Sequence, residues 1–180
     1  MRAAAIVLVL VGLVTLWALG AMGRLLHPRG RMLRAWRVLE AALRSRHELV
    51  PHLVLAIRAV AEPQAEALMA VIDARNAAMI AGGVRQRAAE EVRLSQALRA
   101  FLDSVSQSVP VQADAKVQQL EADLLGLEYA LVGSAMRYNE AALALNRAHE
   151  RVPMNVLAGT FRFEPATPFA PEHTDAPAGT

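Results

Sequence analysis

Two histidines, His47 and His52, are the residues of this chain that most suggest metal chemistry. They begin and end the run His47-Glu48-Leu49-Val50-Pro51-His52. A zinc protease needs two histidines four residues apart, so that both project from one helix face, with a glutamate beside the first as general base. Here the spacing is five, which turns the two rings about 140° apart around a helix, and Pro51 disturbs the segment further. We therefore expect a polar helix face here and no metal site.

Two other polar groups could supply acid–base chemistry. Asp73 and Arg75 are two residues apart, so on a helix they point away from each other, and a solvated face is expected. Tyr138, Asn139 and Glu140 could form a small polar site, but Tyr138 occupies a position where its ring packs in a core. Because no glycine-rich phosphate loop or nucleophile elbow is present, we expect no enzyme activity and no cofactor.

Composition narrows the class of protein further. Apolar residues make up 54% of the 180 positions, which is too many for a disordered chain, and the length suits one folded domain. The absence of cysteine excludes a disulfide scaffold, a cysteine-ligated zinc site and a thiol nucleophile. Residues 47–163 carry slightly more acidic than basic side chains, so a nucleic-acid partner is not expected.

The amino-terminal segment has the character of a membrane span. Residues 3–23, AAAIVLVLVGLVTLWALGAMG, contain no charged side chain. As a helix rising about 1.5 Å per residue, they would extend roughly 31 Å, the thickness of a bilayer core. We predict a transmembrane anchor, with a signal peptide cleaved near Ala18-Leu19-Gly20 as the alternative.

An excess of arginine follows this run: Arg24, Arg29, Arg31, Arg34, Arg37, Arg44 and Arg46, against Glu40 alone. We expect these arginines to face lipid headgroups, with the first five forming the membrane surface. Their excess after the span predicts a single-pass protein of the cell membrane with its carboxyl-terminal domain on the cytoplasmic side.

Heptad spacing predicts the remaining elements. Helices are expected over residues 36–60, 63–82, 84–109 and 114–152, with a bend or break at Pro51 and with stops at Gly82-Gly83, Pro110 and Pro153. Asp114 is expected to cap the last helix. The apolar seam of the first helix contains one polar position, Arg46.

These elements predict an all-α fold, in which an N-terminal transmembrane helix is followed by an antiparallel four-helix bundle with long coiled-coil-like helices. We expect an anchor and juxtamembrane segment over residues 1–29, the bundle over residues 30–163 and a disordered, proline-rich tail over residues 164–180.

Three stretches of this chain resemble signatures of the LemA family. RSRHELVPHLV, from Arg44 to Val54, is similar to the family's RRxDLIPNLV, and VIDAR, ending at Arg75, is similar to its VxxAR. RYNEAALALNRAHERVPMNVLAGTFRFEP, from Arg137 to Pro165, resembles the family's closing motif. The matching positions are Arg46, Leu49, Pro51, Leu53, Arg75, Arg137, Tyr138, Asn139, Asn146, Pro153 and Asn155.

The resemblance implies a membrane-anchored helical bundle and carries over no catalytic residue. Some LemA relatives have lipoprotein signals, which would place the bundle outside the membrane, so both sides stay open despite the arginines. We expect a non-catalytic scaffold that binds a protein partner or a second copy. The alternatives are a lipid-binding or membrane-shaping protein that acts through its arginines, and a hydrolase or metal enzyme, since bundles can hold metal sites in their cores.

Overall fold

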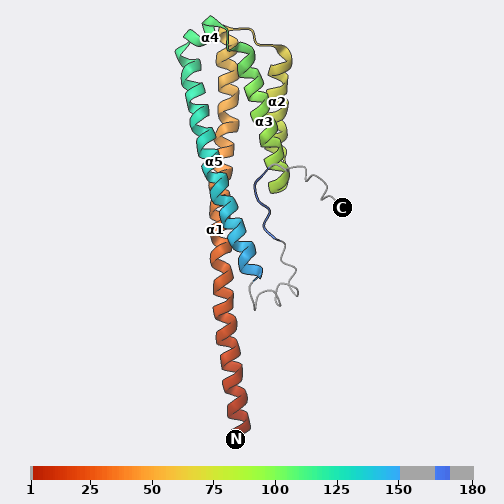
Figure 1. Ribbon diagram of the computed structural model, residues 1–180, viewed down its shortest axis with the longest axis vertical. Helices are drawn as coiled ribbons and strands as arrows, with labels where there is room; N and C mark the ends of the chain where they lie inside the picture. Colours follow the sequence, from red (N-terminus) through yellow and green to blue (C-terminus); the bar gives the residue numbers. More distant parts are fainter. Residues whose placement is uncertain (1, 151–164, 171–180) are drawn as a thin grey trace, which may run out of the picture. The chain divides into compact units, whose positions relative to one another are not determined.

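The computed structural model describes the backbone of residues 2–150 and 165–170, and the side chains of residues 12–13, 27–148 and 165–170. It contains helices α1 (Arg2–Val60), α2 (Ala65–Ile80), α3 (Gly83–Val105), α4 (Val109–Ala113) and α5 (Ala115–Glu150) (Figure 1). No strand occurs in this part of the chain. The predicted all-α fold is confirmed, and α4 is an element that the heptad pattern did not predict.

The described residues form two compact units. The bundle unit comprises Val38–Met136 and residues 167–170. The N-terminal unit comprises residues 2–37, 137–150 and 165–166. Helices α1 and α5 contribute residues to both units.

The bundle unit packs antiparallel segments of α1, α2, α3 and α5 around one apolar core (Figure 1). Its largest fully buried apolar side chains are Phe101, Leu39, Leu53, Ile57, Leu94, Val50, Val71 and Val117. Removing this apolar surface from water is the dominant contribution to folding. The predicted seams of α1 and α5 are confirmed, because their heptad positions are buried or half-buried throughout the described side chains of both helices.

Local signals explain three helix ends. The backbone N–H of Val117 donates to Asp114 Oδ1 over 2.9 Å, which confirms the predicted cap of α5. Gly83 has a φ of +74°, a conformation that an L side chain rarely adopts, at the stop predicted between α2 and α3. The Gln86 side chain accepts the Gly82 N–H over 3.2 Å and so satisfies one exposed donor at the start of α3.

Several helix boundaries differ from prediction. The helix expected to start at Pro63 begins at Ala65, so Pro63 lies outside it. The helix expected to reach Val109 ends at Val105, and Pro110 lies in the first turn of α4, where no backbone N–H is needed. The break considered at Pro51 is not observed, since α1 continues through it to Val60.

Helix α1 contains the run predicted to cross the membrane, but the side chains of residues 3–11 and 14–23 lie outside the described part of the structure. Within the described residues, no helix combines the length and the apolar character of a membrane span.

Candidate functional site

Arg46 lies on the inner face of α1, where only 2% of its surface is exposed. Its heptad position directs the side chain into the bundle, between the turns that carry Leu43 and Val50. The prediction that Arg46 belongs with the lipid-facing arginines is therefore wrong. A buried guanidinium needs counter-charges, because moving a charge out of water costs several kcal/mol.

Arg46 finds its partners on two other helices. Its Nη1 donates to Glu91 Oε2 on α3 over 3.2 Å. Its Nη2 donates to Ser95 Oγ over 2.7 Å and to Glu128 Oε1 on α5 over 2.9 Å. One side chain of α1 thereby joins α3 and α5.

Glu91 extends this cluster to a second residue of α1. Its Oε1 accepts a hydrogen bond from His47 Nε2 over 2.7 Å, and its backbone carbonyl accepts the Ser95 hydroxyl over 3.0 Å. We call the group Arg46, His47, Glu91, Ser95 and Glu128 the polar layer. The polar helix face expected for this run is exposed at Glu48 and His52, whereas His47 is buried among the partners of Arg46.

The polar layer joins α1, α3 and α5 through side-chain hydrogen bonds and ion pairs. Both carboxylate oxygens of Glu91 and the hydroxyl of Ser95 are already engaged. Within the described residues, no three His, Asp or Glu side chains are placed to hold a metal ion. One donor is left over, because Arg46 Nε is buried without a hydrogen-bond partner in this structure.

Arg75 explains why α1 continues through Pro51. In a helix the N–H of residue 51 would donate to the carbonyl of His47, but proline has no N–H. The Nε of Arg75, on α2, donates to that carbonyl over 2.7 Å. The contact replaces the missing helical bond. Arg75 is half-buried, so the solvated face predicted for Asp73 and Arg75 is correct only for Asp73.

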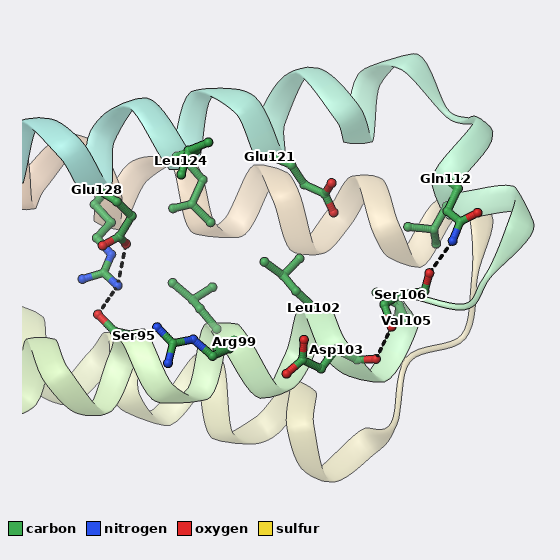
Figure 2. Close-up of a pocket in the computed structure, with 14 residues that line it drawn as sticks. Ser95, Arg99, Leu102, Asp103, Val105, Ser106, Gln112, Glu121, Leu124 and Glu128 are labelled. Atoms are coloured by element: carbon green, nitrogen blue, oxygen red, sulfur yellow. Dashed lines mark hydrogen bonds and ion pairs between the residues drawn. The ribbon is translucent and has the colours of Figure 1, made fainter.

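A pocket of about 630 Å³ lies beside the polar layer, between α3 and α5 (Figure 2). Arg46, Ser95 and Glu128 line one end, and the walls include Leu98, Leu102 and Leu124. This volume is within the usual range of small-molecule sites. No part of the pocket was predicted from the sequence.

A family model described as the LemA family matches residues 35–178, which is most of the chain. The chain belongs to the LemA family. No curated protein matches it.

The first two LemA motifs meet in the bundle unit. Arg46 anchors the polar layer, and Pro51 of the same motif frees the carbonyl that Arg75 of the second motif satisfies. Leu53 is fully buried, and Leu49 packs half-buried against the same core. These motif positions therefore have packing and hydrogen-bonding roles in this LemA protein.

The described residues of the closing LemA motif lie in the N-terminal unit. Tyr138 is buried and its ring lies 5.2 Å from that of Trp36, with an interplanar angle of 59°, which confirms the predicted core position. Burial raises the pKa of Tyr138, because the charged phenolate loses hydration. Arg137 is exposed and Asn139 is half-buried.

Asn146 of this motif binds the start of the tail. Its side-chain amide donates to the Ala166 carbonyl over 3.0 Å, and its carbonyl oxygen accepts the Ala166 N–H over 2.8 Å. The two bonds pair the amide with one backbone residue in the way that a strand neighbour would. Pro153 and Asn155 lie outside the described residues.

Four of the five arginines predicted at the membrane surface, Arg29, Arg31, Arg34 and Arg37, are exposed. The side chain of Arg24 lies outside the described part. An exposed guanidinium is available to a lipid headgroup.

Sequence reasoning missed Glu91 and Glu128 as partners of Arg46. A signal for Glu91 was present: it lies three residues after Ala88 and four before Ser95, at an inner heptad position that a carboxylate occupies only when paired. Glu128 gave no such signal, because it is next to the seam residue Leu127 and is partly exposed.

Proposed function

We propose that this LemA protein is a non-catalytic, membrane-anchored scaffold whose helix α5 binds a partner protein or a second copy of the chain. The observation that supports it is a second apolar face on α5. We call Leu125, Tyr129, Val132 and Met136 the outer stripe. Their exposed fractions are 56%, 72%, 59% and 60%.

The spacing of the outer stripe is that of a helix–helix seam. Its residues follow one another at intervals of four, three and four, as the a and d positions of a coiled coil do. The inner seam of the same helix, which includes Val117, Leu124 and Leu131, is already buried in the bundle. A contiguous apolar face exposed to water typically marks a site of interaction.

Site-specific photocrosslinking in cells tests the interface. A photoreactive phenylalanine at Val132 of the full chain is expected to give a discrete crosslinked product. The same group at Ala130, an exposed position on a different face of α5, is the matched control. Equal products from both positions, or none from Val132, would contradict a partner on the outer stripe.

The anchor rests on the uncharged run from Ala3 to Gly23. We expect the full chain to stay with membranes after alkaline carbonate extraction. Arginine at Val11 and Val14, which puts two charges in the middle of the run, is expected to release it. Release of the unmodified chain by carbonate would contradict the anchor.

We propose that the bundle lies on the cytoplasmic side, from the arginines that follow the run. The chain has no cysteine, so single cysteines at Ala113 and Ala170, both exposed, report the side directly. A membrane-impermeant thiol reagent is expected to label them only after lysis. Labelling in intact cells or spheroplasts would place the bundle outside.

A second candidate function is lipid binding, and it rests on the exposure of Arg29, Arg31, Arg34 and Arg37. A chain that begins at Arg24 is expected to bind anionic vesicles, and added salt is expected to weaken the binding. Changing the four arginines to glutamine is expected to abolish it. Binding that depends on neither salt nor lipid charge would exclude this function.

A further inference from the structure

The outer stripe of α5 has carboxylates along the edge that faces α3. Glu121 and Glu128 both line the pocket between α3 and α5. Each precedes a stripe residue, Leu125 or Val132, by four positions, so on a helix each lies next to the stripe. Glu128 already pairs with Arg46. Glu121 is exposed and forms no ion pair in the described part of the chain, so this edge has a negative charge that a partner can neutralise.

The opposite edge of the outer stripe borders an open groove between α1 and α5. The groove has a volume of about 570 Å³, and its α5 side consists of Ala122, Asp123, Gly126 and Leu127. A Cβ atom added to Gly126 would touch no neighbouring atom, so side chains of a docked segment have room here. Among the described residues that line the groove, Glu48 and Asp123 are carboxylates and none is lysine or arginine. The outer stripe therefore has acidic side chains on both edges.

A second copy of α5 would not neutralise these edges. With the outer stripe at the a and d positions of a heptad, Glu121 and Glu128 take the g positions. The e positions are Gly126 and Gly133. In a parallel pair of helices g faces e, so each glutamate would face a glycine. In an antiparallel pair g faces g, so glutamate would face glutamate and the like charges would repel. Charge complementarity therefore favours a different partner, one with basic side chains.

The length and spacing of the outer stripe indicate a helical partner segment. Leu125 and Met136 are eleven residues apart on α5, a rise of roughly 16 Å at about 1.5 Å per residue. A helix of about three turns covers this distance and repeats its apolar side chains every three and four residues, as the stripe does. An extended strand points alternate side chains to opposite faces and does not match that repeat.

We propose that the outer stripe binds an amphipathic helix of another protein, with lysine or arginine along both sides of its apolar face. The apolar face packs on the stripe, one basic side lies near Glu121, and the other lies over the groove that contains Glu48 and Asp123. This inference rests on the proposed scaffold function, because it takes the outer stripe to be the interface, and it adds the chemistry of the partner.

Three synthetic peptides of about three heptads test the apolar face and the charge separately. The lysine peptide has leucine at a and d and lysine at e and g. The glutamate peptide has glutamate at e and g instead, and the serine peptide keeps the lysines but has serine at a and d. Binding to the full chain in a neutral detergent is measured by fluorescence anisotropy, with detergent micelles alone as the blank. The lysine peptide is expected to bind at least about tenfold more tightly than the other two, and added salt is expected to weaken it several-fold.

A variant of the outer stripe locates the bound peptide without disturbing the core. Val132→Gln changes a side chain that is 59% exposed and is expected to weaken the lysine peptide at least about fivefold, because an apolar contact is lost. Leu55→Gln, which changes a leucine of 61% exposure on α1, is the matched control and is expected to have no effect.

Two double variants test the acidic edges. Glu121→Gln with Asp123→Asn is expected to weaken the lysine peptide several-fold and to reduce its dependence on salt. Glu66→Gln with Asp73→Asn removes the same charge from exposed positions of α2. This control is expected to leave binding within about twofold, because exposed charges far from the peptide are screened.

The proposal is overturned if the glutamate peptide or the serine peptide binds as tightly as the lysine peptide. It is also overturned if either control variant weakens binding as much as its counterpart. Crosslinking through Val132 in cells distinguishes this failure from failure of the scaffold function. If Val132 joins two copies of the chain and the lysine peptide does not bind, the interface is retained and the partner class is wrong. Absence of a crosslinked product from Val132 contradicts the scaffold function itself.

Discussion

The bundle unit contains two buried regions that are stabilised in different ways. The apolar core around Phe101 is built from side chains that only need to fill space, such as Leu53, Ile57 and Val71. The polar layer around Arg46 is built from groups that each need a specific partner at hydrogen-bond distance. Both regions are buried, but only the polar layer fixes which residue of one helix faces which residue of another.

This difference predicts which substitutions the bundle unit tolerates. An apolar side chain can be exchanged for another of similar volume at a modest cost, because dispersion and burial are not directional. A member of the polar layer cannot be removed alone, since its partner would be left charged and out of water. We therefore expect the pairing of α1, α3 and α5 to depend strongly on the polar layer, although the layer contains only five residues.

The largest effects are expected from truncating one residue of each region. Glu91→Ala leaves Arg46 and His47 without their shared carboxylate, and Phe101→Ala leaves a cavity. Each is expected to lower the free energy of unfolding by about 3–5 kcal/mol, measured by urea denaturation.

Conservative variants distinguish the apolar core from the polar layer. Phe101→Leu is expected to lower the free energy of unfolding by less than about 1.5 kcal/mol. Glu91→Gln is expected to cost clearly more, because a neutral amide does not balance the guanidinium. Equal losses of stability for Phe101→Leu and Glu91→Gln would contradict the idea that the polar layer tolerates substitution less well than the apolar core.

Replacing the three buried members of the polar layer together is expected to have the opposite outcome. The triple variant Arg46→Met, His47→Leu, Glu91→Leu removes the buried ion pair and the histidine that shares its carboxylate. It leaves Glu128, whose side chain is 38% exposed and can be hydrated. Buried ion pairs exchanged for apolar side chains are often neutral, or stabilising by about 1–4 kcal/mol. We expect an unfolding free energy no lower than that of the unmodified chain, with a less sharply defined packing visible in the dispersion of methyl NMR signals. A loss as large as that of Glu91→Ala would show that the pairs themselves stabilise the fold.

The hydrogen bond from Arg75 to the His47 carbonyl lies outside the polar layer, and its contribution to stability can be measured by itself. Arg75→Ala leaves the His47 carbonyl without a donor and is expected to cost about 1–3 kcal/mol. Pro51→Ala restores the backbone N–H that this carbonyl lacks, so in the double variant the cost of Arg75→Ala is expected to fall below about 0.5 kcal/mol. The comparison of the four unfolding free energies forms a double-mutant cycle. If the two substitutions are additive, Arg75 does not act through the Pro51 gap.

Two serines on α3 give a matched pair of smaller effects. Ser95 accepts from Arg46 and donates to the Glu91 carbonyl, whereas Ser104 donates only to the Phe101 carbonyl. Ser95→Ala is expected to cost about 1–2 kcal/mol, because Arg46 loses a neutral partner inside the bundle. Ser104→Ala is expected to change stability by less than about 0.5 kcal/mol. Similar losses of unfolding free energy for Ser95→Ala and Ser104→Ala would mean that the bond from Arg46 to Ser95 adds nothing to stability.

The same contrast explains what could be predicted from the sequence. Heptad spacing predicted the seams of α1 and α5, since apolar periodicity is a local property, and Asp114 and Gly82-Gly83 marked real helix boundaries. It missed the end of α3 and the helix α4, because Pro110 both stops one helix and starts another. The bonds of Arg46 and Arg75 span 45 and 28 residues, and a periodic pattern contains no information about partners so far apart. The pocket likewise depends on where α3 and α5 lie relative to each other within the bundle unit, which no single segment encodes.

The N-terminal unit provides a third case, the buried phenol of Tyr138. Burial raises the pKa of Tyr138 above its ordinary value of 10.0, because the phenolate loses hydration in the packed site beside Trp36. The neutral phenol is thus favoured in the folded state. Its contribution to stability is fully present below pH 10 and is lost as the pH rises through the raised value. We expect the unfolding free energy to fall over this alkaline range by a smaller amount than any change above. Tyr138→Phe is expected to abolish that fall, whereas Tyr129→Phe, which removes an exposed phenol of the same helix, is expected to retain it. An alkaline fall that survives in Tyr138→Phe would assign it to another group and would mean that this ring packs beside Trp36 as an ordinary apolar side chain does.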